Sequence, residues 1–355
     1  MRALIDHSGF VLGRPVALAA VLGIAAGILG LALAWPMGAA LASVASLAAS
    51  WLFFAALAAG GVALSAIARV VKGRWADPVT DALESGVAFF PVAFALLAAL
   101  LLAAPLWLPH LGTHSEASWP VLAARNLLGA GLLFAEGTWF ARRSRADRWG
   151  AATGRAAVVY LIIYVLAISF WTIDLVIGLG NGEPSAIVPA QAFIAALLSA
   201  IAWASLLASA GAVTPRLRHD LGKLLFGFSS FWAYFVWCSF LPVWYANLPT
   251  ETGELIDRTS GGWDLVSFAV IASCFFVPFL LLMTEGAKKR PLLLGAASAT
   301  VLLGLGTERY LLVLRPLHVA AAPAALICAT AVALGVVGLF VLLVGSRLPP
   351  RPIQT

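Results

Sequence analysis

Several ionisable and hydroxyl side chains of this sequence lie inside long apolar stretches, where a charge is costly. Arg125 and Glu136 belong to one such stretch, and Tyr160, Tyr164 and Asp174 belong to the next one along the chain. Charged groups inside a membrane-spanning segment usually pair with one another or take part in moving ions or protons. These residues are therefore the first candidates for chemistry.

The polar residues of the two stretches fall at two matching depths if the stretches form neighbouring antiparallel helices. Arg125 would then lie level with Asp174, and an ion pair between them would offset two desolvation costs. Glu136 would lie level with Tyr160 and Tyr164, where its carboxyl group could take up or release a proton. The alternative is that Glu136 and Arg125 extend their polar ends to opposite interfaces.

A third apolar stretch carries hydroxyl groups at helical spacing. Ser230, Tyr234 and Cys238 recur every four residues, so they share one face of a helix. Such a face could hold ordered water and join the carboxylates into a proton path. Equally, Ser and Tyr could simply hydrogen-bond neighbouring helices, as they commonly do in membranes. The candidates for a proton path are therefore Glu136, Asp174, Tyr160, Tyr164, Ser230, Tyr234 and Arg125.

Ten apolar stretches must position these side chains, and each is about the 20 residues that a spanning helix needs. Of the 22 Lys and Arg, three (Arg258, Arg309 and Arg315) lie in odd-numbered gaps and Arg125 lies inside a span, which leaves 18 in even-numbered gaps and at the ends. This asymmetry predicts that both termini are cytoplasmic. The expected spans are about 16–34, 41–67, 86–106, 119–140, 156–178, 190–212, 222–245, 263–283, 291–306 and 321–345.

The composition favours the same fold class, an all-α polytopic membrane protein. The chain is 62% hydrophobic and 11% charged, whereas a soluble domain carries about 25% charged residues. We expect residues 1–355 to form a single integral membrane domain, because no loop is long enough to fold alone. The net charge of +6 is then explained by basic loops facing anionic lipid headgroups rather than by nucleic-acid binding.

The placement of cysteine and histidine argues against a redox cofactor in this chain. Cys238, Cys274 and Cys328 fall singly inside spans, where small residues commonly pack between helices. All five histidines lie in loops or at span ends, so no pair faces across the bundle as haem ligands would. His110 and His114 are four residues apart but have no third ligand. We therefore expect no metal, iron–sulfur cluster or haem here.

The segment from His219 to Glu251 resembles the signature of a known family, the second NrfD-like membrane subunit of bacterial alternative complex III, also called quinol:cytochrome c oxidoreductase quinone-binding subunit 2. The resemblance is carried by Leu221-Gly-Lys-Leu-Leu-Phe226, Phe231-Trp-Ala-Tyr234 and Trp244-Tyr-Ala-Asn-Leu-Pro249. A weaker similarity covers Ile173-Asp174-Leu175 through Leu179 and Glu183-Pro184, and Val277-Pro-Phe279 through Lys288.

The chain also departs from the family pattern at several positions. Asp174, Tyr234 and Asn247 match it, but Leu175 stands where the family has Trp after the Asp. The other departures are Trp237-Cys-Ser-Phe240 in place of Phe-Ser-Gln-Tyr, the interruption Gly180-Asn-Gly182, and Ser185-Ala186 in place of His-Trp. Any family role that depends on those positions is in doubt for this chain.

The resemblance implies a multi-pass subunit of the bacterial inner membrane with NrfD-like helical bundles. It would be a non-catalytic, cofactor-free subunit of a complex that oxidises quinol, passes electrons to a periplasmic c-type cytochrome or similar acceptor, and could conduct protons. The implied partners are membrane lipids, a sister NrfD-like quinol-binding subunit, an iron–sulfur subunit, and multihaem and monohaem c-type cytochromes. Quinone, iron–sulfur clusters and haem c would then belong to those partner subunits.

Two alternatives remain open on the sequence. A proton-coupled secondary transporter would have an inverted repeat and broken helices that meet at the midplane, and neither is apparent from the sequence. A purely structural scaffold subunit would use its polar residues only for helix packing and assembly.

Overall fold

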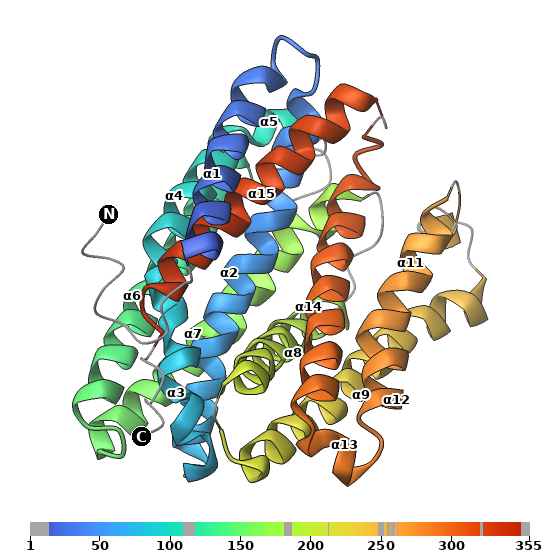
Figure 1. The fold of residues 1–355 in the computed structure, drawn as a ribbon. Helices are drawn as coiled ribbons and strands as arrows, with labels where there is room; N and C mark the ends of the chain where they lie inside the picture. Colours follow the sequence, from blue (N-terminus) through green and yellow to red (C-terminus); the bar gives the residue numbers. More distant parts are fainter. Residues whose placement is uncertain are drawn as a thin grey trace.

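The computed structural model describes residues 14–108, 118–180, 187–211, 213–247, 252–253, 256, 260, 262–319 and 322–348. Every regular element in these ranges is helical (Figure 1). Nine helical segments of the described residues are long and apolar enough to cross a membrane. The protein is therefore an all-α chain with the helices of a multi-pass membrane protein.

These nine segments correspond to nine of the ten expected spans. Six are single helices: α1 (Arg14–Ala34), α2 (Ala40–Val70), α8 (Ile187–Ala210), α9 (Pro215–Ala246), α14 (Pro291–Leu314) and α15 (Pro323–Gly345). The other three are composite. The first combines η2 (Arg74–Ala76), α3 (Asp77–Glu84), η3 (Ser85–Ala88) and α4 (Phe90–Leu102), and the second combines α7 (Ala151–Leu175) with η4 (Ile177–Leu179). The third combines α11 (Trp263–Ile271), the π-helical η5 (Ala272–Phe276) and α12 (Val277–Leu281). Two short helices, α5 (Ala104–Trp107) and α13 (Glu285–Lys289), lie outside them.

The expected span at 119–140 is a long helix, α6 (Trp119–Ala146), but it is not among the nine apolar segments. Arg125 and Glu136 interrupt its apolar surface, and its last turn is basic, with Arg143 and Arg145. Its length of 28 residues is still ample for a bilayer, since a helix rises about 1.5 Å per residue.

Two predicted boundaries are wrong in a way that matters for function. The expected span 291–306 extends to Leu314, so Glu308 and Arg309 lie inside α14 and not in a loop. The expected span 86–106 is preceded by α3, which brings Glu84 into the protein interior. In both places the predicted span stops short of a charged residue, whereas the helical segment continues past it because other helices supply partners for the charge.

The helix α2 lies at the centre of the bundle (Figure 1). In the most apolar 18-residue stretch of α2, 78% is buried. The helix contributes residues to each of two buried clusters of apolar side chains. One cluster is built mainly by α2, α4, α6 and α7, with α15 against it. The other is built mainly by α8, α9, α11 and α14. The polar residues predicted from the sequence are thereby divided between two halves of the molecule.

The first and last described helices, α1 and α15, form an antiparallel pair through glycines. A Cβ atom added to Gly27 would lie 2.7 Å from the Cα atom of Gly335, so the two backbones touch. Gly30 faces Cys328, whereas Gly338 faces Ala20, which fixes the antiparallel direction. Close backbone approach at small residues is a common way for membrane helices to associate. The start of α1 and the end of α15 therefore lie at the same end of the bundle.

The long helix α9 has a defined start and end. The Thr214 hydroxyl accepts a hydrogen bond from the Leu217 N–H at 3.3 Å, and Pro215 occupies the first turn. Asn247 ends the helix with a left-handed backbone, φ 48°, and donates its N–H to the Val243 carbonyl. Asn tolerates this conformation better than most residues. The end of the helix is therefore sufficient to explain an asparagine at position 247.

Candidate functional site

Arg125 and Asp174 form the predicted ion pair between α6 and α7. Arg125 Nε donates to Asp174 Oδ2 at 2.8 Å, and its Nη2 donates to Oδ1. Asn126 adds a third bond, from Nδ2 to Oδ2 at 2.5 Å. The Asp174 side chain is 3% exposed and that of Arg125 is 31% exposed. Two-pronged pairing of this kind is the strongest geometry available to a guanidinium and a carboxylate.

This arrangement restricts what Asp174 can do as a proton carrier. Both carboxylate oxygens accept hydrogen bonds, so a proton on Asp174 would displace at least one donor. Arg125 also lies 5.3 Å from the ring centre of Phe170, which helps to hold its guanidinium. To leave the Asp174 carboxylate free for a proton, the Arg125 guanidinium would have to move away from it, toward the surface on which Arg125 is partly exposed.

The second predicted group, Glu136 with two tyrosines, comes together only in part. Tyr160 donates its hydroxyl to the Ala59 carbonyl of α2 at 2.9 Å and stacks on Tyr164 at a ring distance of 6.2 Å. The α6 residue that faces Tyr160 is Gly137, since a Cβ atom there would lie 2.8 Å from the tyrosine ring. Glu136 therefore shares the predicted depth but makes no hydrogen bond to either tyrosine.

Five buried polar atoms of α6 and α7 have no hydrogen-bond partner among the described residues. They are Oδ1 of Asn126, Oε1 of Glu136, the hydroxyl of Ser144, the hydroxyl of Tyr164 and Nε1 of Trp171. Buried polar groups are paired in the great majority of cases, with protein or with ordered water. These five atoms are therefore sites where water can be held.

The buried side of α7 carries residues of both predicted polar groups, the Arg125–Asp174 pair and the two tyrosines. Tyr160, Tyr164, Trp171 and Asp174 are all buried, and their spacing of four, seven and three residues puts them on one side of the helix. From Tyr160 to Asp174 the helix rises about 21 Å, most of a hydrocarbon core about 30 Å thick. The polar groups of this face thus extend from one end of the bundle toward the other.

Ser230 and Tyr234 do not join this face. They lie on α9, which packs in the other half of the molecule. Ser230 donates to the Phe226 carbonyl one turn earlier at 3.0 Å, and Tyr234 is 58% exposed and stacked on Phe231. Their helical spacing is as predicted, but the helix turns this face away from Glu136 and Asp174.

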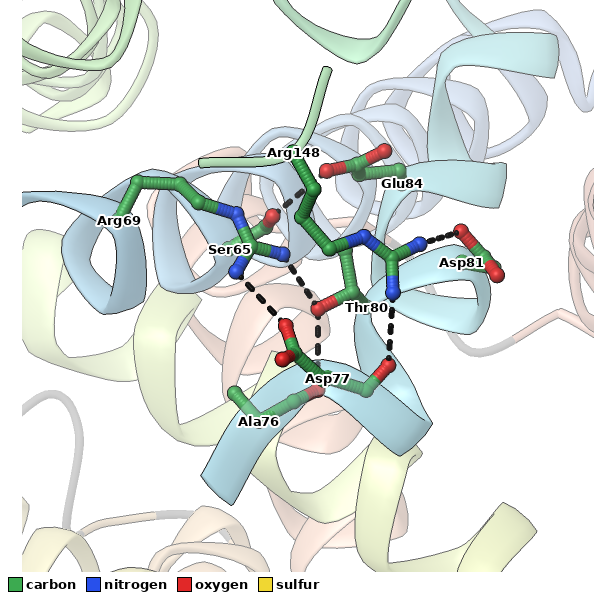
Figure 2. A network of polar contacts seen from close by, with 8 residues as sticks. All are labelled: Ser65, Arg69, Ala76, Asp77, Thr80, Asp81, Glu84 and Arg148. Carbon is green, nitrogen blue, oxygen red and sulfur yellow. Dashed lines mark hydrogen bonds and ion pairs between the residues drawn. The ribbon is translucent and has the colours of Figure 1, made fainter. Parts of the chain in front are cut away.

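A further buried carboxylate, which we did not predict, lies where α3 crosses the end of α2 (Figure 2). Glu84 is fully buried, and its Oε1 accepts a hydrogen bond from the Ser65 hydroxyl at 2.7 Å. Its Oε2 makes no hydrogen bond, although the Ser144 side chain of α6 is close enough to interact. On the same α3, Asp77 is bound by Arg69 Nη1 at 3.0 Å, and Thr80 is bound by Arg69 Nη2 at 2.7 Å.

A second unpredicted carboxylate, Glu308, lies in the other half of the bundle. Its Oε1 accepts from Gln191 Nε2 of α8 at 2.9 Å and from Trp232 Nε1 of α9 at 3.2 Å. Its Oε2 lies 3.4 Å from Arg309 Nη2 without forming a hydrogen bond. The carboxylate joins three helices, so a packing role is sufficient to explain it.

Among the described residues, no three His, Cys, Asp or Glu side chains gather closely enough to hold a metal ion. His110 and His114 lie outside the described residues. Of the segments that carry the family resemblance, Glu183, Pro184 and the end of the Trp244–Pro249 motif also lie outside them.

Comparison with known proteins does not identify the chain. No protein-family model matches the sequence, and no curated protein matches it. What the structure contributes is a multi-pass helical bundle with buried carboxylates at several depths and unpartnered polar atoms on the α6–α7 pair.

Proposed function

We propose that this chain is a membrane subunit of a quinol-oxidising complex of the alternative complex III type, and that it moves protons along the α6–α7 pair. The motif resemblance between His219 and Glu251 supports the choice of family. The observation that carries the proton role is the set of unpartnered buried polar atoms of Glu136, Tyr164 and Trp171. In this proposal both chain ends are cytoplasmic, and the complex lies in a bacterial inner membrane.

The proposed path runs from Glu84 to Asp174. Glu84 lies at the basic end of the bundle, which is the end that carries Arg143 and Arg145 in the last turn of α6, and Asp174 lies toward the other end. Glu136, Tyr160 and Tyr164 lie between them. The separation of about 10 Å along α7 from Tyr164 to Trp171 is too long for direct transfer, so ordered water must bridge it. Quinone, iron–sulfur clusters and c-type haems belong to partner subunits in this proposal, with quinol oxidation biasing the protonation of the carboxylates through a change in packing.

The first test is purification in mild detergent through a tag on this chain, followed by identification of the co-purifying subunits and a reduced-minus-oxidised haem spectrum. A c-type haem signal together with an iron–sulfur protein and a second NrfD-like subunit is the expected result. A colourless single species would contradict the assignment to alternative complex III.

The second test addresses proton movement in the assembled complex. Glu136→Gln and Asp174→Asn should leave assembly and quinol oxidation intact and reduce proton translocation. Glu285→Gln is the matched control, because the Glu285 side chain is 66% exposed on the short helix α13. Unchanged translocation in both test variants would reject the path and leave the scaffold role.

One observation favours the alternative of a proton-coupled transporter. Two spanning segments are interrupted: η5 is a π-helical stretch midway between α11 and α12, and η3 separates α3 from α4. Interrupted helices often line binding sites in transporters. Purification as a single colourless species, followed by proton-dependent uptake in vesicles, would favour this reading.

A further inference from the structure

Among the described residues, three arginines and one carboxylate line a cavity of about 330 Å³ at the end of the bundle where α6 and α15 finish. Asp81 comes from α3, Arg145 from the last turn of α6, Arg148 from the connection that follows α6, and Arg347 from the residues just after α15. Its volume falls within the range of about 300–1,000 Å³ typical of ligand pockets. Segments far apart in the sequence therefore bring three guanidinium groups to one hollow.

The positive charge of this cavity is only partly neutralised. Arg148 Nη2 pairs with Asp81 at 2.5 Å, and its Nη1 donates to the Asp77 carbonyl at 3.2 Å (Figure 2). The Asp77 carboxylate is already bound by Arg69. Arg145 and Arg347 are exposed and form no ion pair with any described residue. In the described part of the chain, three positive charges thus face one negative charge at this cavity.

The contacts of Arg148 also prepare it to bind an anion. The Asp77 carbonyl and Asp81 hold its guanidinium through Nη1 and Nη2, so little side-chain freedom is lost when a ligand arrives. Arginine is well suited to phosphate, because its planar N–H groups can donate two parallel hydrogen bonds. Arg145 and Arg347 are free to contribute the remaining donors.

The position of the cavity identifies the class of ligand. It lies at the ends of α6 and α15, and α15 is one of the apolar segments long enough to cross a membrane. A helix end of that kind lies at the level of the lipid headgroups. Basic pockets between membrane helices at that level suit the headgroups of anionic phospholipids.

We propose that this cavity binds the phosphate group of an anionic phospholipid, held by Arg145, Arg148 and Arg347. The same chemistry would also accept a free phosphate ion from solution. The proposal does not depend on the function proposed above, since it rests only on the cavity and its charges.

The test measures lipid binding by the delipidated full-length chain in one detergent. Phosphatidylglycerol, phosphatidylcholine and inorganic phosphate are titrated separately, and bound states are counted by native mass spectrometry. Arg145→Gln with Arg347→Gln should weaken phosphatidylglycerol binding about 5-fold per arginine, or roughly 25-fold together. Binding of phosphatidylcholine, which has no net charge, should change little.

The matched control is Arg142→Gln with Arg216→Gln. Both residues are exposed at the basic end, neither lines the cavity, and the loss of net charge is the same. The control should keep its phosphatidylglycerol affinity within about threefold, since a surface charge contributes mainly through the diffuse field. Because all four residues are exposed, each variant is expected to fold, and a matching thermal unfolding temperature without lipid checks this.

Equal weakening in both double variants would overturn the proposal, because the attraction would then be a general effect of charge. No difference between phosphatidylglycerol and phosphatidylcholine would overturn it as well. If inorganic phosphate binds with the same dependence on Arg145 and Arg347 while phosphatidylglycerol does not, the phosphate site stands and its source is a soluble anion.

Discussion

At the scale of single residues, the Arg125–Asp174 pair is unequal in its exposure, and this predicts an unequal response to substitution. Arg125→Gln leaves the Asp174 carboxylate, 3% exposed, without its cation, whereas Asp174→Asn leaves a guanidinium that is 31% exposed and can turn outward. Breaking a buried pair costs about 3–5 kcal/mol when the remaining charge stays buried. We expect about 3 kcal/mol for Arg125→Gln and about 1 kcal/mol for Asp174→Asn.

The unfolding temperature of the detergent-purified protein measures this difference. The double variant, Arg125→Gln with Asp174→Asn, should be more stable than Arg125→Gln alone, because it no longer contains the buried charge. A greater loss in Asp174→Asn than in Arg125→Gln would contradict the argument from exposure.

Glu136 allows stability and function to be separated at one position. Its Oε1 is buried without a hydrogen-bond partner among the described residues, so the carboxyl group costs stability where it stands. Glu136→Leu should therefore raise the unfolding temperature, by the equivalent of about 1–2 kcal/mol, while abolishing any proton transfer through this position. A lower unfolding temperature would show that Glu136 has a structural partner.

At the scale of helices, the glycine contacts of α1 make the most direct prediction. Only 17% of the most apolar 18-residue stretch of α1 is buried, and the main neighbour of α1 is α15. The α1–α15 interface must therefore hold α1 in place. Gly27→Leu would force its side chain against the backbone of Gly335 and should destabilise the pair by about 1–3 kcal/mol. Gly129→Leu on α6 is the control, because open space surrounds Gly129.

The readout is the yield of a disulfide between cysteines placed at Ala26 and Ala331, which line one groove between the two helices and already carry a Cβ atom. The yield should fall in the Gly27→Leu background and stay unchanged in the Gly129→Leu background. An unchanged yield in both would mean that other contacts hold α1 in place.

The comparison of sequence with structure is also clearest for helices. Ten apolar stretches were enough to predict ten long helical segments, because the length of a span is a local property of the chain. Helix ends at charged residues were predicted wrongly, as at Glu308 and Glu84. Their partners, Gln191 and Ser65, come from other helices, and sequence spacing contains no signal for such contacts.

The same reasoning explains the outcome for the candidate site. The Arg125–Asp174 pair was predictable because both residues lie on consecutive helices, whose depths can be counted from the connecting loop. For Tyr234 the helix face was predicted correctly, but its position beside Glu136 and Asp174 was not. Its direction depends on how α9 packs against α8 and α14, which involves residues far apart in the chain.

At the scale of the whole molecule, one outer surface is unusually aromatic. Along α9 the side chains of Phe231, Tyr234, Trp237 and Trp244 are between 43% and 61% exposed. A lipid-facing surface needs only apolar side chains, whereas partner interfaces are enriched in Tyr and Trp. Within the proposed function, this surface is where a partner subunit would dock.

Replacement of Tyr234 and Trp237 by Leu tests this docking. The variant stays apolar enough for lipid but loses the aromatic contacts, so the co-purification of partner subunits should fall while the unfolding temperature of the isolated chain stays unchanged. Trp139→Leu, at an exposed position on α6, is the control. Full co-purification of the double variant would show that this surface faces lipid.

The orientation predicted from the charge asymmetry can be tested by reporter fusions. A reporter that fluoresces only in the cytoplasm should be active after Leu348, and one that needs the periplasm should be active between Trp107 and Trp119. Because α1 and α15 run antiparallel in direct contact, both ends of the described chain must lie on one side. An inverted pattern would therefore reject only the predicted orientation, whereas reporters that place the two ends on opposite sides would contradict the α1–α15 packing itself.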